Sequence, residues 1–385
     1  MTSPVVAADV YVGEELAGHF TTHADGRTEF DYVEGATKAV ASTLPISGAP
    51  YVTSAGALPP FFANLLPEGR RLSTLKRSVK ASFDDELALL VAVGSDTVGD
   101  VSVVAHGRPL APSPAVIDLS GPLDFSVAIT DAGIADPIAV PGVQDKASAR
   151  TIAAPVRGRS TEYILKVSPP EYPKLVENEA ECFAIAAAAK YPLAETQLLI
   201  DASGRPGLLI TRFDRLDGTR LHVEDAAQVM GLYPSAKYSP AMEEVAEALM
   251  GVSASPSLTA RSIAFQVALA WLTGNGDLHA KNLSLIWRGR RAEMSPIYDI
   301  PSTVPYGDST MALSVQGRKD NISGKAFRAF CTEIGLTVNA TERVMAQALR
   351  VTDGAAERIV SAADFDPRRA RDLRRVLDRR RKLWG

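Results

Sequence analysis

Residues 275 to 282 read NGDLHAKN and combine residue types that phosphoryl transfer requires. Asp277 precedes Asn282 by five positions, so the carboxylate can orient a hydroxyl group while the amide oxygen binds a metal ion. A second carboxylate, Asp299, follows in the segment MSPIYDI and can link a metal ion to phosphates. Lys281 can neutralise charge on the transferring phosphoryl group. The set predicts catalytic roles for Asp277 and Lys281, and ligation of Mg²⁺ by Asn282 and Asp299.

The flanking segments must bring the two acids together. The segment TARSIAFQVALAWLTG predicts a buried helix over 259–273, with Thr259 as its N-cap and Gly274 as its stop. LSLIW then predicts a strand, RGRRAE a turn and MSPIYDI the partner strand, which returns Asp299 to the loop. The alternative is an ordinary Asn-Gly turn with Asp277 as a cap. That alternative leaves the polar residues after the turn without a role.

Upstream, the predicted strand EYILKVSP carries Lys166 among apolar neighbours, where a lysine can hold ATP phosphates. The predicted helix LVENEAECFAIAAAAKY follows, with Glu177 and Glu179 as ion-pair partners, of which Glu179 is favoured. A lone strand lysine usually faces solvent, so this assignment depends on the downstream loop. For His279, a structural role is the alternative to nucleotide contact. Further candidate ATP-binding residues lie in the loop PGVQDK, the hairpin end ITRFDR and the polar junction: Gly142, Val143, Gln144, Lys146, Thr211, Arg212, Phe213, His279, Asn282 and Tyr298.

Length and composition favour more than one folded unit. The chain has 385 residues, of which 46% are hydrophobic and 22% charged, as is ordinary for a globular protein. The first hundred residues predict strands and turns, and a Pro-, Gly- and Ser-rich stretch follows between 105 and 160. A β-containing lobe is then followed by a helical one. Helices are predicted over 241–250, 259–273, 324–334, 340–350, 354–363 and the tail.

Several classes of protein are disfavoured. The longest apolar runs, such as CFAIAAAA, are too short to cross a bilayer, and the N-terminus MTSPVVAADV lacks a signal-peptide pattern, so a cytoplasmic protein without membrane contact is expected. Cys182 and Cys331 lie far apart in predicted helices, which predicts buried thiols and no metal cluster. Four other histidines are scattered along the chain and predict no metal site: His19, His23, His106 and His222.

The last twenty residues, DPRRARDLRRVLDRRRKLWG, contain nine Lys or Arg and three Asp, a local charge of +6 in a chain whose net charge is −4. Ala370, Leu373, Leu377 and either Leu383 or Trp384 recur near helical spacing, which predicts an amphipathic helix with an Arg-rich outer face. A solvated final helix is one interpretation. Contact with DNA phosphates, or with an acidic partner that binds DNA, is the other.

Taken together, the motifs resemble the HipA-like serine/threonine kinases, the toxins of bacterial HipA and HipB toxin-antitoxin pairs. The matching segments are FFANLLPEG, GVQDK, EYILK, NEAECF, TRFDR, NGDLHAKNLSL and PIYDI, in that order between positions 61 and 300. The resemblance implies an α+β, bilobal protein-kinase-like fold. Its parts are expected to be a β-rich accessory domain over 1–110, a kinase N-lobe over 111–215 and an all-helical C-terminal lobe over 216–385.

The resemblance also implies the chemistry and the partners. ATP and Mg²⁺ are the expected cofactors, with Asp277 as catalytic base, Asn282 and Asp299 on the metal, and Lys166 on the phosphates. The expected substrate is a translation component such as an aminoacyl-tRNA synthetase. A HipB-like helix-turn-helix antitoxin is expected to neutralise the protein, and the Arg-rich tail would then lie near DNA.

One position departs from the family pattern. The family's self-inactivating phosphorylation falls on a serine three residues before the loop glycine, and this chain has Ala139 there, counted back from Gly142. The resemblance therefore implies that autophosphorylation by that route is impossible. Ser148, six residues after the glycine, is the substitute acceptor, and an ordinary loop serine is the alternative.

Two other functions compete. A small-molecule phosphotransferase of the aminoglycoside or choline type carries a similar loop, but such enzymes usually lack the N-terminal sheet and the GVQDK loop. A catalytically idle co-repressor partner would use the fold only for docking. An idle protein has no physical need to keep Lys166, Asp277, Asn282 and Asp299 together, so the kinase interpretation is favoured.

Overall fold

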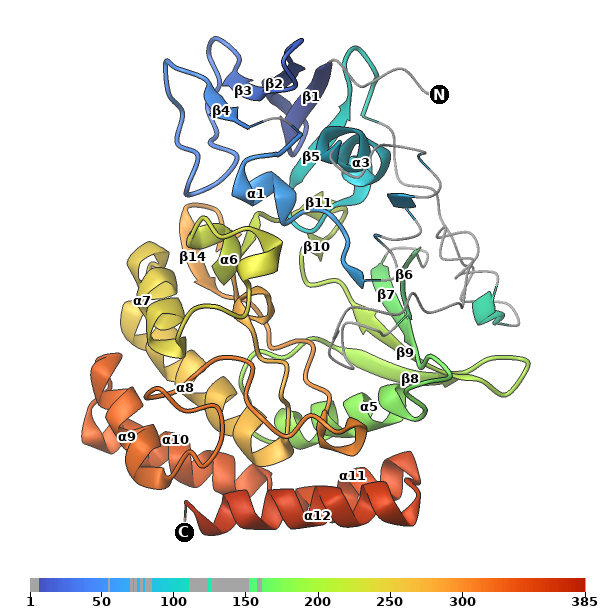
Figure 1. Ribbon diagram of the computed structural model, residues 1–385, viewed down its shortest axis with the longest axis vertical. Coiled ribbons are helices and arrows are strands. Elements are labelled where there is room, and N and C mark those ends of the chain that lie inside the picture. The colour runs from blue at the N-terminus through green and yellow to red at the C-terminus, as the bar shows by residue number, and fades with distance from the viewer. Residues whose placement is uncertain are drawn as a thin grey trace.

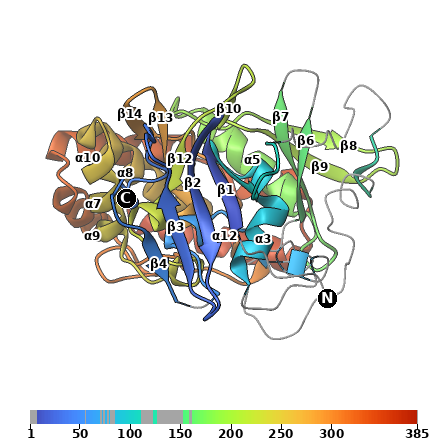
Figure 2. The same cartoon turned by 90° about the horizontal axis from the view of Figure 1, so that it is seen from above.

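The computed structural model describes residues 7–54, 56–69, 72, 75–76, 79, 85–110, 123–126, 152–157 and 161–384 (Figure 1). An accessory domain lies at one end, above a sheet-containing N-lobe and a larger C-lobe, and Figure 2 shows it from above, over both lobes. The described residues form one hydrophobic cluster within the accessory domain and another that runs through both lobes. No described helix is both long and apolar enough to cross a bilayer.

The accessory domain is built on a five-stranded antiparallel sheet of order β4-β3-β2-β1-β5. On one face of the sheet, Phe20 and Phe30 pack with Phe62, and the ring centres of the three lie 4.7 to 5.3 Å apart. Asp85 caps α3 by accepting from Ala88 N–H, and Gly94 is the C-cap residue. The elements are β1 (Ala7–Val12), β2 (Glu15–Thr22), β3 (Thr28–Tyr32), β4 (Tyr51–Thr53), α1 (Pro60–Ala63), α3 (Glu86–Val93), η1 (Gly94–Asp96) and β5 (Val101–Ala105).

The N-lobe holds a four-stranded antiparallel sheet of order β6-β7-β9-β8, against which one helix, α5, packs. The predicted lysine strand, helix and hairpin are all present. On β7, Leu165 and Val167 are buried on one face, so Lys166 points to the other face. The elements are β6 (Ile152–Arg157), β7 (Glu162–Val167), α5 (Leu175–Ala187), β8 (Thr196–Ile200) and β9 (Pro206–Thr211).

The C-lobe is mostly helical and is centred on α8, whose residues from Ile263 to Thr273 are all buried. The structure adds to the expected all-helical lobe a three-stranded sheet of order β12-β13-β14 and a short β10-β11 hairpin. Both cysteines are buried, free thiols, as predicted. The helices are α6 (Ala226–Val229), η3 (Pro234–Ala236), α7 (Met242–Val252), α8 (Pro256–Thr273), η4 (Ala280–Asn282), η5 (Val304–Tyr306), α9 (Gly324–Glu333), α10 (Val338–Val351), α11 (Ala355–Ala363) and α12 (Pro367–Lys382), and the strands are β10 (Arg215–Leu216), β11 (Thr219–Arg220), β12 (Val223–Asp225), β13 (Ser284–Arg288) and β14 (Arg291–Met294).

Two local predictions were wrong. Helix α8 begins at Pro256 with Ser255 as the N-cap residue, and Thr259 lies inside the helix, where its hydroxyl bonds Ser253 at 2.7 Å. The partner of β13 is β14, which ends at Met294 before the segment SPIYDI begins, because Gly289 closes a tight turn after Arg288. Asp299 therefore lies on a loop beyond the hairpin.

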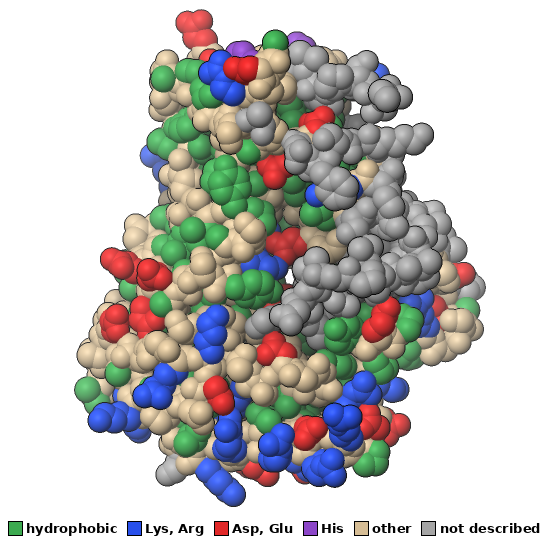
Figure 3. All heavy atoms as spheres, viewed as in Figure 1, with side chains coloured by type: hydrophobic (Ala, Val, Ile, Leu, Met, Phe, Trp, Pro, Cys, Tyr) green, Lys and Arg blue, Asp and Glu red, His purple; other side chains and the backbone are tan. Residues whose placement is uncertain are grey.

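The tail forms α12, but its arginines do not all face outward. Ala370, Leu373 and Leu377 are buried as predicted, and Trp384 takes the last apolar position while Leu383 is 37% exposed. Arg380 is fully buried: Nη1 donates to Trp271 O at 2.8 Å, and the guanidinium lies 4.0 Å from the Trp271 ring centre. The remaining basic side chains gather along the edge of the molecule that carries α12 (Figure 3).

Candidate active site

The predicted catalytic loop, which carries Asp277, begins where α8 stops. Gly274 adopts φ +77°, and a Cβ there would meet Val304 Cγ2 at 2.7 Å. A Cβ on Gly276 would lie 2.5 Å from Thr310 O and 2.6 Å from Thr303 Oγ1. Both glycines are therefore required by the close approach of the 302–310 loop. The sharp turn places Asp277, which is 1% exposed, directly beyond the buried helix.

Asp277 is held by hydrogen bonds from its own backbone and from its neighbours. Its backbone N–H donates to Asn275 Oδ1 at 2.8 Å, and Asn282 Nδ2 donates to its carbonyl oxygen at 2.8 Å. The hydroxyl of Tyr238 donates to Asp277 Oδ1 at 3.1 Å. Since the amide nitrogen of Asn282 fixes the loop, its amide oxygen is the atom available to a cation.

Lys166 lies between two carboxylates from different elements. Its Nζ is 2.8 Å from Glu179 Oε1 on α5 and 2.6 Å from Asp299 Oδ1 on the loop after β14. Glu177 pairs instead with Lys174 at 3.3 Å, so the structure selects Glu179 of the two candidate acids. The Lys166 side chain is 12% exposed and Glu179 is fully buried.

Burial and mutual attraction set the pKa values of the Lys166 triad, which consists of Lys166, Glu179 and Asp299. Burial opposes the charged form of Lys166, but the two carboxylates outweigh it and raise the lysine pKa. Burial likewise opposes ionisation of Asp299, and the Lys166 charge outweighs it and lowers the Asp299 pKa. For Glu179, burial wins and raises the pKa, aided by the nearby Asp299 charge.

The loop that carries Asp299 is fixed by α5. Asn178 Nδ2 donates to Ser302 O at 2.7 Å, and Ser302 N–H donates back to Asn178 Oδ1 at 3.2 Å. Asp299 itself has φ +54°, an uncommon conformation for a residue with a side chain. Residues in such conformations persist when their surroundings fix them, and they occur often at functional sites.

Lys281 is bound from the accessory domain. Its Nζ lies 2.8 Å from Glu68 Oε1 and donates to Asn64 O at 3.1 Å. Lys237 makes a second ion pair with Glu68. Burial of Glu68 favours its neutral form, but the two lysines outweigh this and lower its pKa to about 2. The segment FFANLLPEG of the accessory domain thus reaches the catalytic loop.

His279 and the aromatic residues line the same region. Burial and the Lys237 charge lower the pKa of His279 to about 3, so the ring is neutral near pH 7. His279 Nε2 is 4.0 Å from Asp277 Oδ2, and its buried Nδ1 has no hydrogen-bond partner among the described residues. Tyr298 donates to Lys281 O at 2.7 Å, and its ring lies 5.4 Å from that of Phe213.

The Arg212 side chain lies away from this group and serves another contact. Its Nη1 is 2.6 Å from Asp96 Oδ1, and its Nη2 donates to Thr97 O at 3.0 Å and to Asp214 Oδ2 at 2.9 Å. Arg215 joins the same cluster through Asp96 at 3.0 Å. The segment TRFDR therefore fastens the accessory domain to the end of β9, and an ATP contact of Arg212 stays a prediction.

Several predicted residues lie outside the described part of the chain, namely the phosphate-loop residues Gly142, Val143, Gln144 and Lys146, together with Ala139 and Ser148. Thr211 is described and ends β9, with its N–H bonded to Glu195 O at 2.9 Å. Sequence reasoning missed Glu68, Asn178, Lys237 and Tyr238. Of these, only Asn178 and Glu68 could have been found from the sequence, because they lie in the family-like segments NEAECF and FFANLLPEG.

Comparison with known proteins decides the family. Residues 138–358 match the HipA-like C-terminal domain, and residues 8–104 match the HipA N-terminal domain. The chain belongs to the HipA-like kinase family. The two matches cover both the accessory domain and the lobes that hold the Lys166 triad.

Relatives of this HipA-like chain extend over most of its length. Two Sinorhizobium fredii proteins are named as kinases. Y4mE is 28% identical to this chain over 91% of both chains, and Y4dM is 32% identical over 82% of both chains. The serine/threonine-protein kinase toxin HipA of Shewanella oneidensis is 26% identical over 88% of this chain and 86% of its own. A structure of HipA from that organism, in a complex with HipB and operator DNA, matches with a TM-score of 0.78 and 20% identity, covering 98% and 97% of the two chains. That structural likeness shows the shared α+β fold.

Proposed function

We propose that this HipA-like protein is an ATP- and Mg²⁺-dependent serine/threonine protein kinase and the toxin of a toxin-antitoxin pair. The observation that carries the proposal is Lys166, held between Glu179 and Asp299. A lysine on a strand, paired with a helix glutamate, is the arrangement that kinases use to hold ATP phosphates. The named kinases among its relatives support the same activity.

The donors present suit Mg²⁺. Asn282 offers its amide oxygen and Asp299 a carboxylate, and both are hard oxygen ligands of the kind that Mg²⁺ accepts in small number. The metal would supply charge neutralisation at the phosphates. With a metal bound, Asp299 would serve as its ligand, and Lys166 would keep Glu179 as its partner and could donate to the phosphates.

Asp277 has the position of a catalytic base. Its Oδ1 accepts from Tyr238, which fixes the carboxylate so that Oδ2 can accept the proton of a serine or threonine hydroxyl. Lys281 lies on the same loop, where its charge can stabilise the transferring phosphoryl group. The neutral His279 ring beside Asp277 leaves the carboxylate as the group that takes up the proton.

The remaining nucleotide contacts are proposed for the residues that the sequence predicts. We assign the phosphates to the backbone of Gly142, Val143 and Gln144 and to Lys146, as the sequence predicts. Thr211, Phe213, His279 and Tyr298 are assigned to the nucleotide's base and sugar side, because Phe213 and Tyr298 pack together next to the catalytic loop. Arg212 is assigned to the accessory-domain contact.

The proposed partners are a translation component as substrate and a HipB-like helix-turn-helix antitoxin. The match to a HipA in complex with HipB and operator DNA supports the antitoxin. The basic side chains of α12 are proposed to contact DNA phosphates within that complex, although ion pairs such as Arg374 with Glu357 and Arg379 with Asp320 occupy part of this charge.

The direct test is Asp277→Asn, which keeps the shape of the side chain and removes the base. ATP-dependent phosphorylation of added protein is expected to fall at least 100-fold, because the charge that orients the hydroxyl is lost. Transfer of labelled phosphate from Mg-ATP measures the effect, and circular dichroism checks the fold. The matched control is Asp31→Asn, an exposed acid on β3.

The outcomes separate the functions. Labelling that survives Asp277→Asn removes Asp277 as the base, and a wild type that does not bind Mg-ATP at all removes the kinase proposal. Phosphoproteomics of cells expressing the wild type or Asp277→Asn identifies the substrate class. Mass spectrometry after incubation with Mg-ATP tests Ser148, and an unmodified Ser148 in active protein rejects it as an acceptor.

A further inference from the structure

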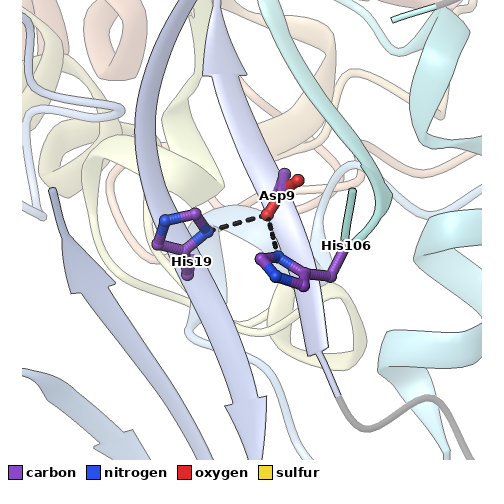
Figure 4. Close-up of side chains that lie close together, drawn as sticks. All are labelled: Asp9, His19 and His106. Carbon is purple, nitrogen blue, oxygen red and sulfur yellow. Dashed lines mark hydrogen bonds and ion pairs between the residues drawn. The ribbon is translucent and has the colours of Figure 1, made fainter. Parts of the chain in front are cut away.

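A cluster of one carboxylate and two imidazoles lies on the accessory-domain sheet, apart from the active site (Figure 4). Asp9 comes from β1, His19 from β2, and His106 follows the end of β5. The Nδ1 atoms of His19 and His106 each lie 2.7 Å from Asp9 Oδ1. The sequence predicted no metal site from these histidines, because 97 positions separate Asp9 from His106.

Strand pairing brings the three side chains to one face. Asp9 is directly opposite His19 in the β1–β2 ladder and opposite Val104 in the β1–β5 ladder. His106 lies two residues beyond Val104, on the same face, and its N–H continues the pairing by donating to Ala7 O at 3.2 Å. The cluster is therefore set by three hydrogen-bonded strands and not by a loop.

The orientation of the Asp9 carboxylate is fixed by the backbone of the turn after β5. The Gly107 N–H donates to Oδ2 at 2.9 Å, which fixes the carboxylate with Oδ1 toward the two rings. Hydrogen bonds that orient a ligand in this way are typical of metal sites.

The donor atoms suit a transition metal. One carboxylate oxygen and one nitrogen from each ring lie within 4.8 Å of one another. Two nitrogens and one oxygen form a set that Zn²⁺ accepts, whereas Mg²⁺ and Ca²⁺ prefer oxygen ligands. The His19 and His106 side chains are 38% and 63% exposed, so solvent reaches the open side of the cluster.

We propose that Asp9, His19 and His106 bind one divalent transition metal ion, with Zn²⁺ as the fitting ion and water at the open position. Each ring then presents the Nδ1 lone pair to the metal and carries its proton on Nε2, so no proton is lost from a neutral ring. The bound ion links β2, β1 and the end of β5. Its consequence is metal-dependent stabilisation of the accessory domain, independent of phosphoryl transfer.

The test uses the full chain, freed of metal by dialysis against a chelator and then titrated with Zn²⁺ in competition with a chromophoric chelator. The wild type is expected to bind one Zn²⁺ that His106→Gln binds at least 100-fold more weakly, because one of three ligands is lost. Asp9→Asn is expected to behave in the same way. Zn²⁺, but not Mg²⁺, should raise the unfolding temperature of the wild type and leave that of both variants unchanged.

The matched control is His23→Gln, because His23 lies beside the same sheet and pairs only with Glu29. This variant should bind Zn²⁺ as the wild type does. Equal Zn²⁺ affinity in the wild type and in His106→Gln, or an equal loss in His23→Gln, would overturn the proposal and leave a hydrogen-bonded cluster. Cobalt(II) substitution gives an independent readout: intense visible absorption in the wild type alone supports a four-coordinate site, and its absence contradicts one.

Discussion

At the scale of single residues, Lys166 connects three parts of the site that the chain encodes far apart. It pairs with Oε1 of the buried Glu179, and it also neutralises Asp299 on a loop 133 residues away. Two carboxylates at one ammonium ion remain stable in a buried position because that ion offsets the cost of desolvating them. The same residue therefore holds the fold together at the site proposed for the nucleotide.

Lys166→Met should accordingly cost both activity and stability. Phosphorylation is expected to be lost, and the free energy of unfolding near pH 7 should fall by about 3–5 kcal/mol, since buried carboxylates are left without a cation. The loss should shrink at acidic pH, because burial raises the Glu179 pKa and protonation removes the unpaired charge. Denaturant unfolding at both pH values measures it. Lys174→Met, which removes a half-exposed ion pair with Glu177, should cost less than about 1 kcal/mol.

The sequence predicts candidate catalytic residues because phosphoryl transfer restricts their spacing. Asp277 and Asn282 share one short loop, so their proximity follows from the chain itself. The partners of a long side chain, by contrast, do not follow from its position in the chain. Arg212 is predicted to lie near ATP, and its guanidinium bonds Asp214, two residues along the chain, and Asp96 of the accessory domain. Local sequence does not encode the second of these contacts.

At the scale of elements, the turn after α8 is the most constrained part of the site. Gly276→Ala would bring a methyl group within 2.5 Å of Thr310 O and 2.6 Å of Thr303 Oγ1, so the loop must shift. The variant is expected to lose about 1–3 kcal/mol of unfolding free energy and most of its kinase activity. Thermal unfolding and phosphate transfer measure the two losses. Gly251→Ala, where a Cβ meets nothing within 4 Å, should be neutral, and an equal loss in both variants would contradict this account.

A second element-scale prediction concerns Glu68, which reaches from the accessory domain to Lys281. Its pKa falls from 4.5 to about 2, so its charge stabilises the fold above pH 4.5, and this contribution is lost as the pH falls toward 2. Glu68→Gln should lose on the order of 1–3 kcal/mol at pH 7 and much less at pH 3. Kinase activity should fall as well, because Lys281 loses its orientation.

Urea unfolding at the two pH values and the rate of phosphate transfer test Glu68→Gln. Glu293→Gln is the matched control, since Glu293 forms an ion pair with Arg288 in which both side chains are about half exposed. A Glu68→Gln protein with wild-type stability and wild-type rate would show that the accessory domain does not position the catalytic loop.

The helices and strands themselves were largely predictable. Helices such as α9 and α10 follow apolar periodicity that stops at Ile334 and Thr352, which local sequence encodes. The partner strand of β13 was predicted too far along the chain, at MSPIYDI. The tight turn at Gly289 makes β14 the partner, and the segment SPIYDI forms a loop. The closeness of Asp9 to His106 depends on the register between β1 and β5. The spacing of residues along the chain does not reveal that register.

At the scale of the whole molecule, the accessory domain is fastened to both lobes through buried polar contacts. Arg212 and Arg215 form one contact, at the end of β9. The other is centred on His222, whose Nδ1 lies 2.7 Å from Asp100 and whose Nε2 lies 3.1 Å from Glu224. Glu224 also accepts from Ser42 of the accessory domain at 2.7 and 2.8 Å. Such contacts fix the domain over the catalytic loop.

This second contact should make stability depend on pH. Burial opposes the charged form of His222, but Asp100 and Glu224 outweigh it and raise the His222 pKa from 6.5 to about 9, while Phe61 and Trp287 cover the ring. A raised pKa contributes stability that is fully present below pH 6.5 and is lost as the pH rises through 9. We expect the free energy of unfolding to fall by about 3 kcal/mol across that window. His222→Gln should be less stable at pH 6.5 and should lack this slope, whereas His23→Gln should keep it. Urea midpoints between pH 6 and 9.5 measure the effect, and parallel curves for the wild type and His222→Gln would mean that a charged His222 does not hold the accessory domain in place.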